Sequence, residues 1–210
     1  MKVLLVNGST RKKGCTATAL QEIEIQLHAE GIETEWFQIG NRVLRGCTGC
    51  EMCHKKRENL CVYGDDDGVN ELIRKAAECD GYVFGTPVHY AAACGSITSL
   101  LDRAFYASSK TFAFKPAACI ASCRRAGSTA ALEQLMKYPA INNMPVVSSQ
   151  YWNMVHGNTP EEVRQDMEGM QIMRTLGRNM AWMLKLIELG KENGLEHPQL
   201  EKRQWTNFIR

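Results

Sequence analysis

The stretch that decides the fold is MKVLLVNGSTRKKGCT, residues 1–16. Its apolar, β-branched run at residues 2–7 predicts a buried strand, which stops at Gly8 because a turn begins there. Apolar residues then recur at helical spacing over residues 16–30, so a helix follows the turn directly. A buried strand, a polar turn and a helix in this order predict the first unit of a parallel α/β sheet.

The same alternation continues along the chain. It predicts four more strands, at residues 32–39, 81–86, 117–122 and 146–149. Further helices are expected at residues 69–77, 97–105, around 132–136, and 160–194. Strands that alternate with helices predict a five-stranded parallel sheet covered on both faces, which is a three-layer α/β sandwich.

Some local signals mark where helices begin and end. Residues 159–162, Thr-Pro-Glu-Glu, match a capping box with proline at the first helical position, which predicts the start of the last helix. Gly194 is expected to end that helix. Asp67 is the predicted N-cap of the helix at 69–77.

Composition restricts the class of protein. The chain has 210 residues, of which 44% are hydrophobic and 23% charged, and this suits one α/β domain over residues 1–210. Within it we expect a cysteine-rich loop at 46–64 and a C-terminal helix plus tail at 160–210. The formal net charge of +2 argues against a nucleic-acid partner. The N-terminal apolar run is too short for a signal peptide and no stretch could span a bilayer, so we expect a cytoplasmic protein without membrane contact.

The loop after the first strand, Gly8 to Thr16, is a candidate phosphate site. Ligands of open parallel sheets bind beyond the carboxyl ends of the strands, and a helix N-terminus attracts anions. Ser9 and Thr16 add hydroxyl donors, and Arg11 adds a charged one. The spacing fits neither the Walker A pattern nor the dinucleotide pattern, so a monophosphate fits better. The alternative is an ordinary polar turn with a basic edge.

Two further loops complete the predicted site. In the loop 86–95, Pro87 is expected to stop the strand, and His89 and Tyr90 offer flat surfaces for a flavin ring. One alternative is a helix-entry loop whose aromatic residues pack in the core, and another is that His89 is an ordinary surface histidine. In the loop 122–128, Arg124 and Arg125 can bind an anion or the phosphate of a nicotinamide cofactor, or they simply face solvent.

Nine cysteines are many for a protein in a reducing compartment, and four of them form the pattern Cys47-x2-Cys50-x2-Cys53-x7-Cys61. Thiolates at this spacing can converge on one iron–sulfur cluster. Zinc is a second interpretation, and reduced surface thiols are a third. The basic run Lys55–Arg57 favours the thiolate form that metals require.

At these motifs the chain resembles the NADPH-dependent FMN reductase family of flavodoxin-like proteins, in the branch near the iron–sulfur flavoproteins. The resemblance covers nearly the whole chain. It rests on GSTRKKGCT, on GCTGCEMC with a fourth cysteine and an acidic run after it, on FGTPVHYAAACG, and on SCRRAG. The chain departs from the pattern at His89, where tyrosine is common, and at Ala91, where glycine is common. The gap of seven residues before Cys61 lies at the long end for iron–sulfur relatives.

The resemblance implies a flavodoxin-like fold that binds FMN. It implies that the phosphate is held by Ser9, Arg11, Gly14 and Thr16. It implies that the ribityl chain and ring are lined by Pro87, Val88, His89 and Tyr90, and that the pocket is closed by Arg124, Arg125 and Gly127. Cys15, Thr86 and Ser122 lie in the same loops and complete the candidate cofactor-binding set. A homodimer or homotetramer is implied as well.

The expected function is that of an FMN-dependent oxidoreductase of the NAD(P)H-dependent FMN or quinone reductase type, acting between small-molecule electron donors and acceptors. One alternative is an iron–sulfur flavoprotein, which relays electrons between FMN and a [4Fe–4S] cluster. Another is a non-catalytic, flavin-binding electron carrier. The candidate metal ligands are Cys47, Cys50, Cys53 and Cys61. No catalytic residue is assigned, because the flavin itself carries the chemistry.

Overall fold

The computed structural model describes residues 1–56 and 58–209. Arg57, the last member of the basic run Lys55–Arg57, lies outside the described residues. The strands are β1 (Lys2–Asn7), β2 (Glu33–Gln38), β3 (Gly81–His89), β4 (Ala92–Ala93), β5 (Ala117–Cys123) and β6 (Met154–His156). The helices are α1 (Cys15–Ala29), α2 (Met52–Lys56), α3 (Val69–Ala77), α4 (Gly95–Phe112), α5 (Ser128–Ile141), α6 (Pro160–Gln165) and α7 (Met167–Glu192).

Five strands pair in parallel in the order β2-β1-β3-β5-β6, and the short β4 pairs with β3 in the antiparallel sense. The prediction of a flavodoxin-like, parallel α/β sheet is therefore confirmed. Consecutive parallel strands need crossover helices, and the crossovers α1, α3, α4 and α5 alternate with the strands along the chain.

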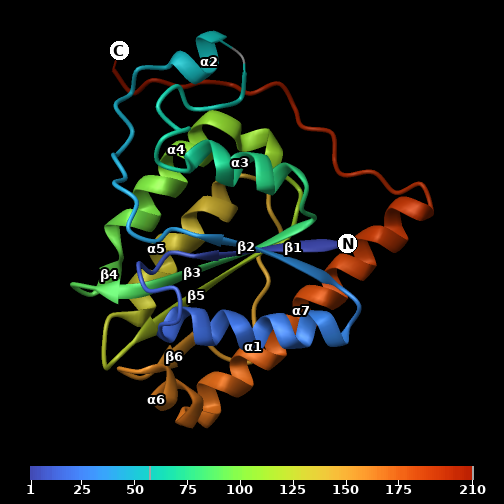
Figure 1. The fold of residues 1–210 in the computed structure, drawn as a ribbon. Helices are drawn as coiled ribbons and strands as arrows, with labels where there is room; N and C mark the ends of the chain where they lie inside the picture. Colours follow the sequence, from blue (N-terminus) through green and yellow to red (C-terminus); the bar gives the residue numbers. More distant parts are fainter. Residues whose placement is uncertain (57, 210) are drawn as a thin grey trace.

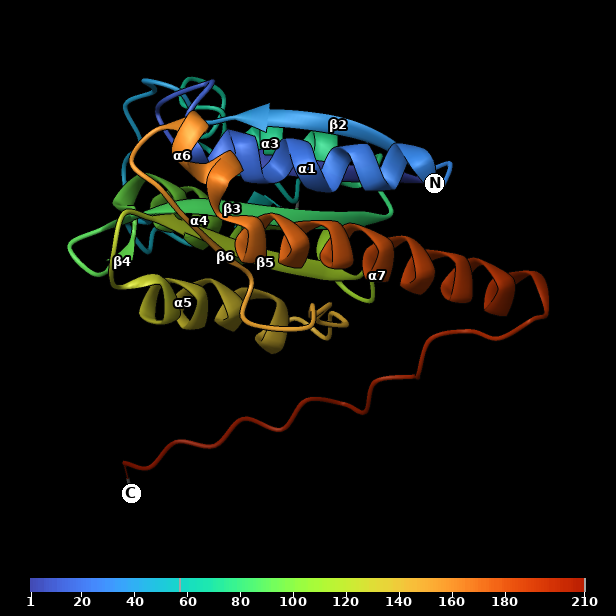
Figure 2. The same ribbon diagram turned by 90° about the horizontal axis from the view of Figure 1, so that it is seen from below.

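The two layers of helices follow from the alternation of apolar side chains along buried strands. In β1, Leu4 and Val6 pack with α3, α4 and α5, whereas Val3 and Leu5 pack with α1 and α7. Figure 1 shows α3 and α4 above the sheet and α1 below it. Figure 2 shows α1 and α7 side by side across the lower face, and the C-terminal segment leaving α7 as an extended chain.

The predicted fifth strand at 146–149 is wrong. The last strand of the sheet is β6, which pairs with the final residues of β5, and only Val146 forms an isolated bridge, to Ala117. Between the two, Ser149 donates its hydroxyl hydrogen bond to the carbonyl of Ile172 in α7, so the chain leaves the sheet edge there. A short apolar run cannot by itself tell an edge strand from a segment packed under a helix.

Two predicted boundaries change and two are confirmed. Strand β3 continues through Pro87 to His89. The single long helix predicted at 160–194 is divided at Asp166, whose carboxylate caps α7 by accepting a hydrogen bond from the Gly169 N–H at 2.9 Å. Its start is confirmed, because the Thr159 side chain caps α6. Its end is confirmed as well, because Gly194 has a φ of +79° just beyond α7.

Asp67 does not occupy the predicted N-cap position, which belongs to Gly68 in the left-handed conformation. The Asp67 carboxylate still accepts a hydrogen bond from the Val69 N–H at 3.4 Å, but its other oxygen forms an ion pair with Arg103 of α4. The acidic side chain is therefore buried against a cation that sequence spacing alone does not reveal. Among the helices of the described residues, none is long and apolar enough to cross a membrane.

The buried face of α1 gives a matched test of the core. We expect Ile23→Ala to lower the free energy of unfolding by about 2–5 kcal/mol, because it removes a fully buried side chain and leaves a cavity. Ile25 lies on the same helix and is 57% exposed, so Ile25→Ala should change stability by less than about 0.5 kcal/mol. Urea unfolding of both variants measures the difference, and equal losses would contradict the orientation of α1.

Candidate functional site

The carboxyl ends of β1, β3 and β5 bring three loops to one edge of the sheet, residues 8–14 and 124–127 and the hairpin 88–93 between β3 and β4. The Gly8 N–H donates a hydrogen bond to the Gly85 carbonyl at 2.8 Å, which joins the first loop to β3. A Cβ at Gly8 would lie 2.6 Å from Cδ1 of Ile97 in α4, so only glycine allows this close approach. The first loop therefore begins in direct contact with β3.

The first loop is held by two polar side chains that the sequence analysis did not select. Asn7 accepts a hydrogen bond from the Ser9 N–H at 3.0 Å and donates one to Gln38 Oε1 at 2.7 Å. Gln38 in turn donates to the Ser9 carbonyl at 2.6 Å, and the Ser9 hydroxyl oxygen accepts from the Arg11 N–H at 3.1 Å. The signal that could have found Asn7 is an amide side chain at the end of an otherwise apolar strand.

The start of α1 offers backbone donors to an anion. Gly14 is the N-cap residue and no side chain caps the helix, so the first N–H groups of α1 lack an intrahelical acceptor. Arg11 is exposed beside them, and so are Lys12 and Lys13. Helix N-termini with free N–H groups and nearby cations bind phosphate groups. The local chemistry of this loop fits a phosphate monoester.

Contacts between the loops close the site. The hydroxyls of Thr16 and Ser122 are hydrogen-bonded to each other at 2.8 Å, which joins the first loop to β5. The Cys94 thiol donates to the Gly8 carbonyl at 3.1 Å, and the Cys94 N–H donates to the Thr86 hydroxyl at 3.0 Å. Thr86 and Ser122 are both buried and support the loops from below.

The tip of the hairpin between β3 and β4 is the most exposed part of the site. Tyr90 and Ala91 have φ values of +49° and +59°, and the Tyr90 side chain is fully exposed. His89 is exposed as well, which leaves both ring systems free to face a planar ligand. One alternative interpretation of this loop required the aromatic side chains to pack in the core, and neither of them does. Pro87 and Val88 are half-buried below them.

The third loop meets the hairpin at Gly127. This residue has a φ of +93°, and a Cβ there would lie 2.6 Å from Cα of Ala91. Arg124 and Arg125 are exposed beside it. The three loops thus contact one another at one edge of the sheet, an arrangement that we call the cradle; the candidate cofactor-binding residues lie on these loops, at the start of α1, or at the ends of β3 and β5.

Cys15 begins α1 inside this cradle. Its thiol donates a weak hydrogen bond to the Gly157 carbonyl at 3.6 Å. Burial raises the pKa of the Cys15 thiol, and Arg11 only partly opposes that effect. The Cys15 thiol therefore ionises less readily than a free thiol, and its backbone belongs to the uncapped first turn of α1.

The four cysteines of the loop 46–64 line one small cavity of about 20 Å³, together with Arg103 and Tyr106 of α4. All four are free thiols. Cys53 is buried on α2, Cys47 is exposed, and Cys50 and Cys61 are intermediate. The four cysteines therefore lie around one cavity, and their role as metal ligands stays a prediction.

The thiols differ in their electrostatic surroundings. A hydrogen bond from the backbone of Met52, helped by the Thr48 side chain and by the positive charge of Lys55, lowers the pKa of Cys50. Burial instead raises the pKa of Cys53. The pKa values of these two thiols are therefore shifted in opposite directions, that of Cys50 down and that of Cys53 up.

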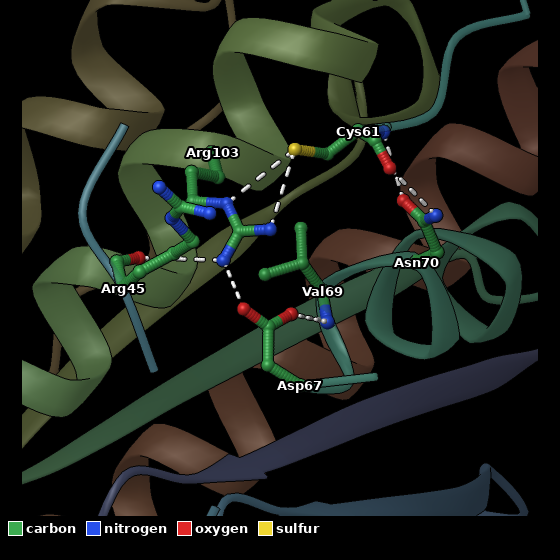
Figure 3. A network of polar contacts seen from close by, with 6 residues as sticks. All are labelled: Arg45, Cys61, Asp67, Val69, Asn70 and Arg103. Atoms are coloured by element: carbon green, nitrogen blue, oxygen red, sulfur yellow. Dashed lines mark hydrogen bonds and ion pairs between the residues drawn. The ribbon is translucent and has the colours of Figure 1, made fainter. Parts of the chain in front are cut away.

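Cys61 is the most firmly held of the four. Its N–H donates to Asn70 Oδ1 at 2.8 Å, and its carbonyl accepts from Asn70 Nδ2 at 2.9 Å. Its sulfur accepts two hydrogen bonds from Arg103, from Nε at 3.4 Å and from Nη2 at 3.3 Å. Figure 3 shows the guanidinium of Arg103 between Cys61, Asp67 and the carbonyl of Arg45. Burial opposes the charge, but the bonds to Asp67 and Cys61 outweigh it and raise the pKa of Arg103.

Four cysteines can serve as the ligands of two kinds of metal centre, a zinc ion and a [4Fe–4S] cluster. Within residues 1–56 and 58–209, no group of three or more His, Cys, Asp or Glu side chains is arranged around a point that could hold a single metal ion. Tetrahedral zinc with Zn–S distances of about 2.3 Å needs sulfurs about 3.8 Å apart. A [4Fe–4S] cluster spreads its four thiolates around a larger cube. Four cysteines around one cavity are the ligand set that a [4Fe–4S] cluster requires.

Comparison with known proteins gives a consistent picture. The family model described as NADPH-dependent FMN reductase matches residues 1–159. An iron–sulfur flavoprotein of Methanocaldococcus jannaschii is 30% identical over 199 residues, which cover 90% of this chain and 100% of that protein. An iron–sulfur flavoprotein of Archaeoglobus fulgidus is 27% identical over 198 residues, which cover 87% of this chain and 97% of that protein.

Solved structures agree on the fold. RosB with bound 8-demethyl-8-formylriboflavin-5'-phosphate has a TM-score of 0.68 at 15% identity, and the match covers 100% of this chain and 92% of RosB. A flavodoxin from the domain Archaea has a TM-score of 0.59 at 14% identity, covering 88% of this chain and 99% of the flavodoxin. At such low identity these likenesses establish the flavodoxin-like fold alone.

The junction between the hairpin and the third loop can be tested with two glycines. Gly127→Ala forces a left-handed φ on alanine and sets its Cβ against Ala91, so we expect a stability loss of about 1–2 kcal/mol and weaker FMN binding. Gly95 also borders the second loop, but a Cβ there meets nothing within 4 Å. Gly95→Ala should be neutral or stabilising by up to about 1 kcal/mol. Thermal unfolding and FMN titration of both variants give the comparison, and similar behaviour would exclude the close contact.

Proposed function

The chain belongs to the NADPH-dependent FMN reductase family, and from that premise we propose that it relays electrons between FMN in the three-loop cradle and a [4Fe–4S] cluster on four cysteines. As a member of this family it is an FMN-dependent oxidoreductase with a flavodoxin-like fold. The observation that carries the proposal is the single cavity lined by Cys47, Cys50, Cys53 and Cys61. Among the alternatives left open by the sequence, this cavity favours the iron–sulfur flavoprotein.

The cradle supplies what FMN needs. FMN, once bound, takes up and releases electrons either singly or as a hydride. The N–H groups at the start of α1 are the proposed donors to its phosphate, with Ser9, Arg11, Gly14, Cys15 and Thr16 around them. The close approach that Gly8 permits holds this loop against β3 and α4.

The second and third loops are the proposed contacts of the flavin ring. His89 and Tyr90 offer exposed ring surfaces, with Pro87 and Val88 below them and Thr86 as support. Ser122, Arg124, Arg125 and Gly127 are proposed to close the pocket. The positive charge of the two arginines favours the reduced flavin, because reduction adds negative charge to the ring.

The cysteine loop supplies the ligands of the cluster. Cys61 is proposed as the preformed ligand, since its backbone and its sulfur are both fixed by hydrogen bonds. Cys47, Cys50 and Cys53 complete the set from a loop that bends at Gly49, whose φ is +64°. Thiols remain available as ligands only in a reducing compartment, so the proposal places the protein in the cytoplasm.

We also propose a homodimer or homotetramer that acts on small-molecule electron donors and acceptors. Support comes from large apolar side chains at the surface of α7 and of the segment before β6. Trp182 is 61% exposed and Trp152 is 58% exposed. Apolar surface of this kind commonly marks contacts between subunits.

The phosphate contact can be tested in the first loop. We expect Arg11→Ala to weaken FMN binding by about 1.5–3 kcal/mol, because it removes a charged donor to the phosphate. Lys13→Ala removes an exposed charge from the same loop and should cause a smaller loss. Isothermal titration of the flavin-free variants with FMN measures both. An unchanged dissociation constant for Arg11→Ala would show that Arg11 does not touch the phosphate.

The cluster can be tested by anaerobic reconstitution with iron and sulfide. The parent protein should gain broad visible absorbance and four irons per chain, as a [4Fe–4S] cluster requires. Cys61→Ala should lose this capacity while it retains FMN. Cys79→Ala is the matched control, since Cys79 is buried in the core and does not line the cavity. If Cys61→Ala and Cys79→Ala assemble the same iron, the cluster proposal is wrong.

A second candidate function is direct reduction of FMN by NAD(P)H. The specific observation in its favour is the pair of exposed arginines, Arg124 and Arg125, beside the cradle, which suits the phosphate of NADPH. Anaerobic stopped-flow mixing with NADPH should then bleach the flavin, and Arg125→Ala should raise the NADPH concentration needed for half-maximal rate. A flavin that dithionite reduces but NADPH does not would exclude this function.

A further inference from the structure

Arg103 is a buried cation that the proposed cofactor-binding and metal-binding residues do not include. We propose that Arg103 is a positioning residue that holds Cys61 toward the cluster and raises the reduction potential of the cluster through two N–H···S hydrogen bonds. This inference rests on the proposed function, since it requires a cluster on the four cysteines.

The guanidinium of Arg103 directs two N–H groups, Nε–H and Nη2–H, at one sulfur atom, and we call this pair of donors the fork. Arg103 lies on α4 and is 3% exposed, so its guanidinium is removed from water. Nε and Nη2 both point to Cys61 Sγ, at 3.4 and 3.3 Å. Nη1 serves the Asp67 carboxylate and also donates to the carbonyl of Arg45 at 3.3 Å. One side chain therefore contacts three separate segments of the chain around the cavity (Figure 3).

The charged guanidinium of Arg103 needs a strong hydrogen-bond acceptor at the position of the Cys61 sulfur. A neutral thiol is only a weak hydrogen-bond acceptor, and charged donors that are buried without adequate partners are costly. A cysteine bound to iron is a thiolate, which carries negative charge and accepts strongly. The two donors of Arg103 that do not serve Asp67 are thus well matched only when Cys61 is a ligand.

Asp67 holds the guanidinium of Arg103 in place. It pairs with Arg103 and accepts a hydrogen bond from the Val69 N–H at the start of α3, so it fixes the guanidinium between α3 and α4. The pair has no net charge, which leaves directed N–H groups as its main effect on the sulfur. Cys61 itself is fixed on the other side by Asn70. The ligand and its donor are therefore held by separate elements and can stay in place while the rest of the loop accepts the cluster.

The consequence for the potential has a definite sign. Reduction of a cluster adds one negative charge, part of which resides on its sulfurs. Donors to those sulfurs stabilise the more negative state, and so they raise the reduction potential. Loss of the two N–H···S bonds should make the cluster harder to reduce, and it should also loosen the fourth ligand.

The experiment uses FMN-loaded protein reconstituted anaerobically with ferrous iron and sulfide. Two variants remove the fork in different ways. Arg103→Lys keeps the positive charge, and the double variant Asp67→Asn with Arg103→Met removes both charges of the pair, so that no buried ion is left alone. Arg45→Gln is the control, because Arg45 is an exposed cation that stacks on Tyr63 beside the same cavity and gives no side-chain bond to a cysteine.

Potentials are measured by titration followed with electron paramagnetic resonance, and iron retention by release to a chelator. Both fork variants should show a more negative cluster potential than the parent and faster iron release, by about 10–100-fold, as for other partners of metal ligands. Arg45→Gln should change both quantities less. An FMN-loaded variant that assembles no cluster also supports the proposal.

Two results overturn it. If both fork variants keep the parental potential and iron release, Arg103 only braces the loop. If Arg45→Gln shifts the potential as much as the fork variants, net charge and not the directed bonds sets it. A parent protein that forms no cluster refutes the proposed function as well, which distinguishes that failure from the first two. Bound FMN in each sample confirms that the variant is folded. If Arg103→Lys loses FMN, the comparison of cluster potential and iron release relies on the double variant alone.

Discussion

Parallel pairing of β1, β3 and β5 is the constraint on which the rest of the structure depends. These strands are buried on both faces, so a shift in register by one residue would move the core side chains of each helix layer into the other layer. Their common direction sends three loops to one edge, where Gly8 and Gly127 allow backbone and hairpin to approach closely. The cradle that we propose for FMN therefore depends on sheet geometry first and on particular side chains second.

Helix α4 connects this edge of the sheet with the cysteine loop. It begins at Gly95 beside the hairpin, and at a rise of about 1.5 Å per residue Arg103 lies about 12 Å further along the same helix. The guanidinium then fixes Cys61 and Asp67 from outside the sheet. One rigid element thus connects the place proposed for FMN with the place proposed for the cluster, and neither site can move far without the other.

Local signals in the sequence predicted much of this arrangement. The strand, turn and helix over residues 1–30, the cap at Thr159 and the end at Gly194 are all short-range features, and each was confirmed. The four-cysteine spacing pointed to one cavity, which the structure contains. The role of these cysteines, and of the loop residues around FMN, stays a prediction.

Long-range partners could not be read from the sequence. Asp67 looked like a helix cap because three acidic residues precede α3, yet it pairs with Arg103, which is 36 residues away. Asn7 and Gln38 support the first loop across two strands; Asn7 has a local signal, as an amide at the end of an apolar strand, but its partnership with Gln38 does not. The strand expected at 146–149 is wrong because of another long-range contact, the hydrogen bond from the Ser149 hydroxyl to the Ile172 carbonyl in α7. Periodicity reports which face is buried, but it does not report what lies opposite.

Native mass spectrometry of protein purified and kept without oxygen tests the central claim most directly. The account predicts that each chain carries the added mass of one FMN and one [4Fe–4S] cluster, and that mild acid removes the cluster mass before the chain unfolds. A chain that carries FMN with zinc, or FMN with no metal after reconstitution, would contradict it.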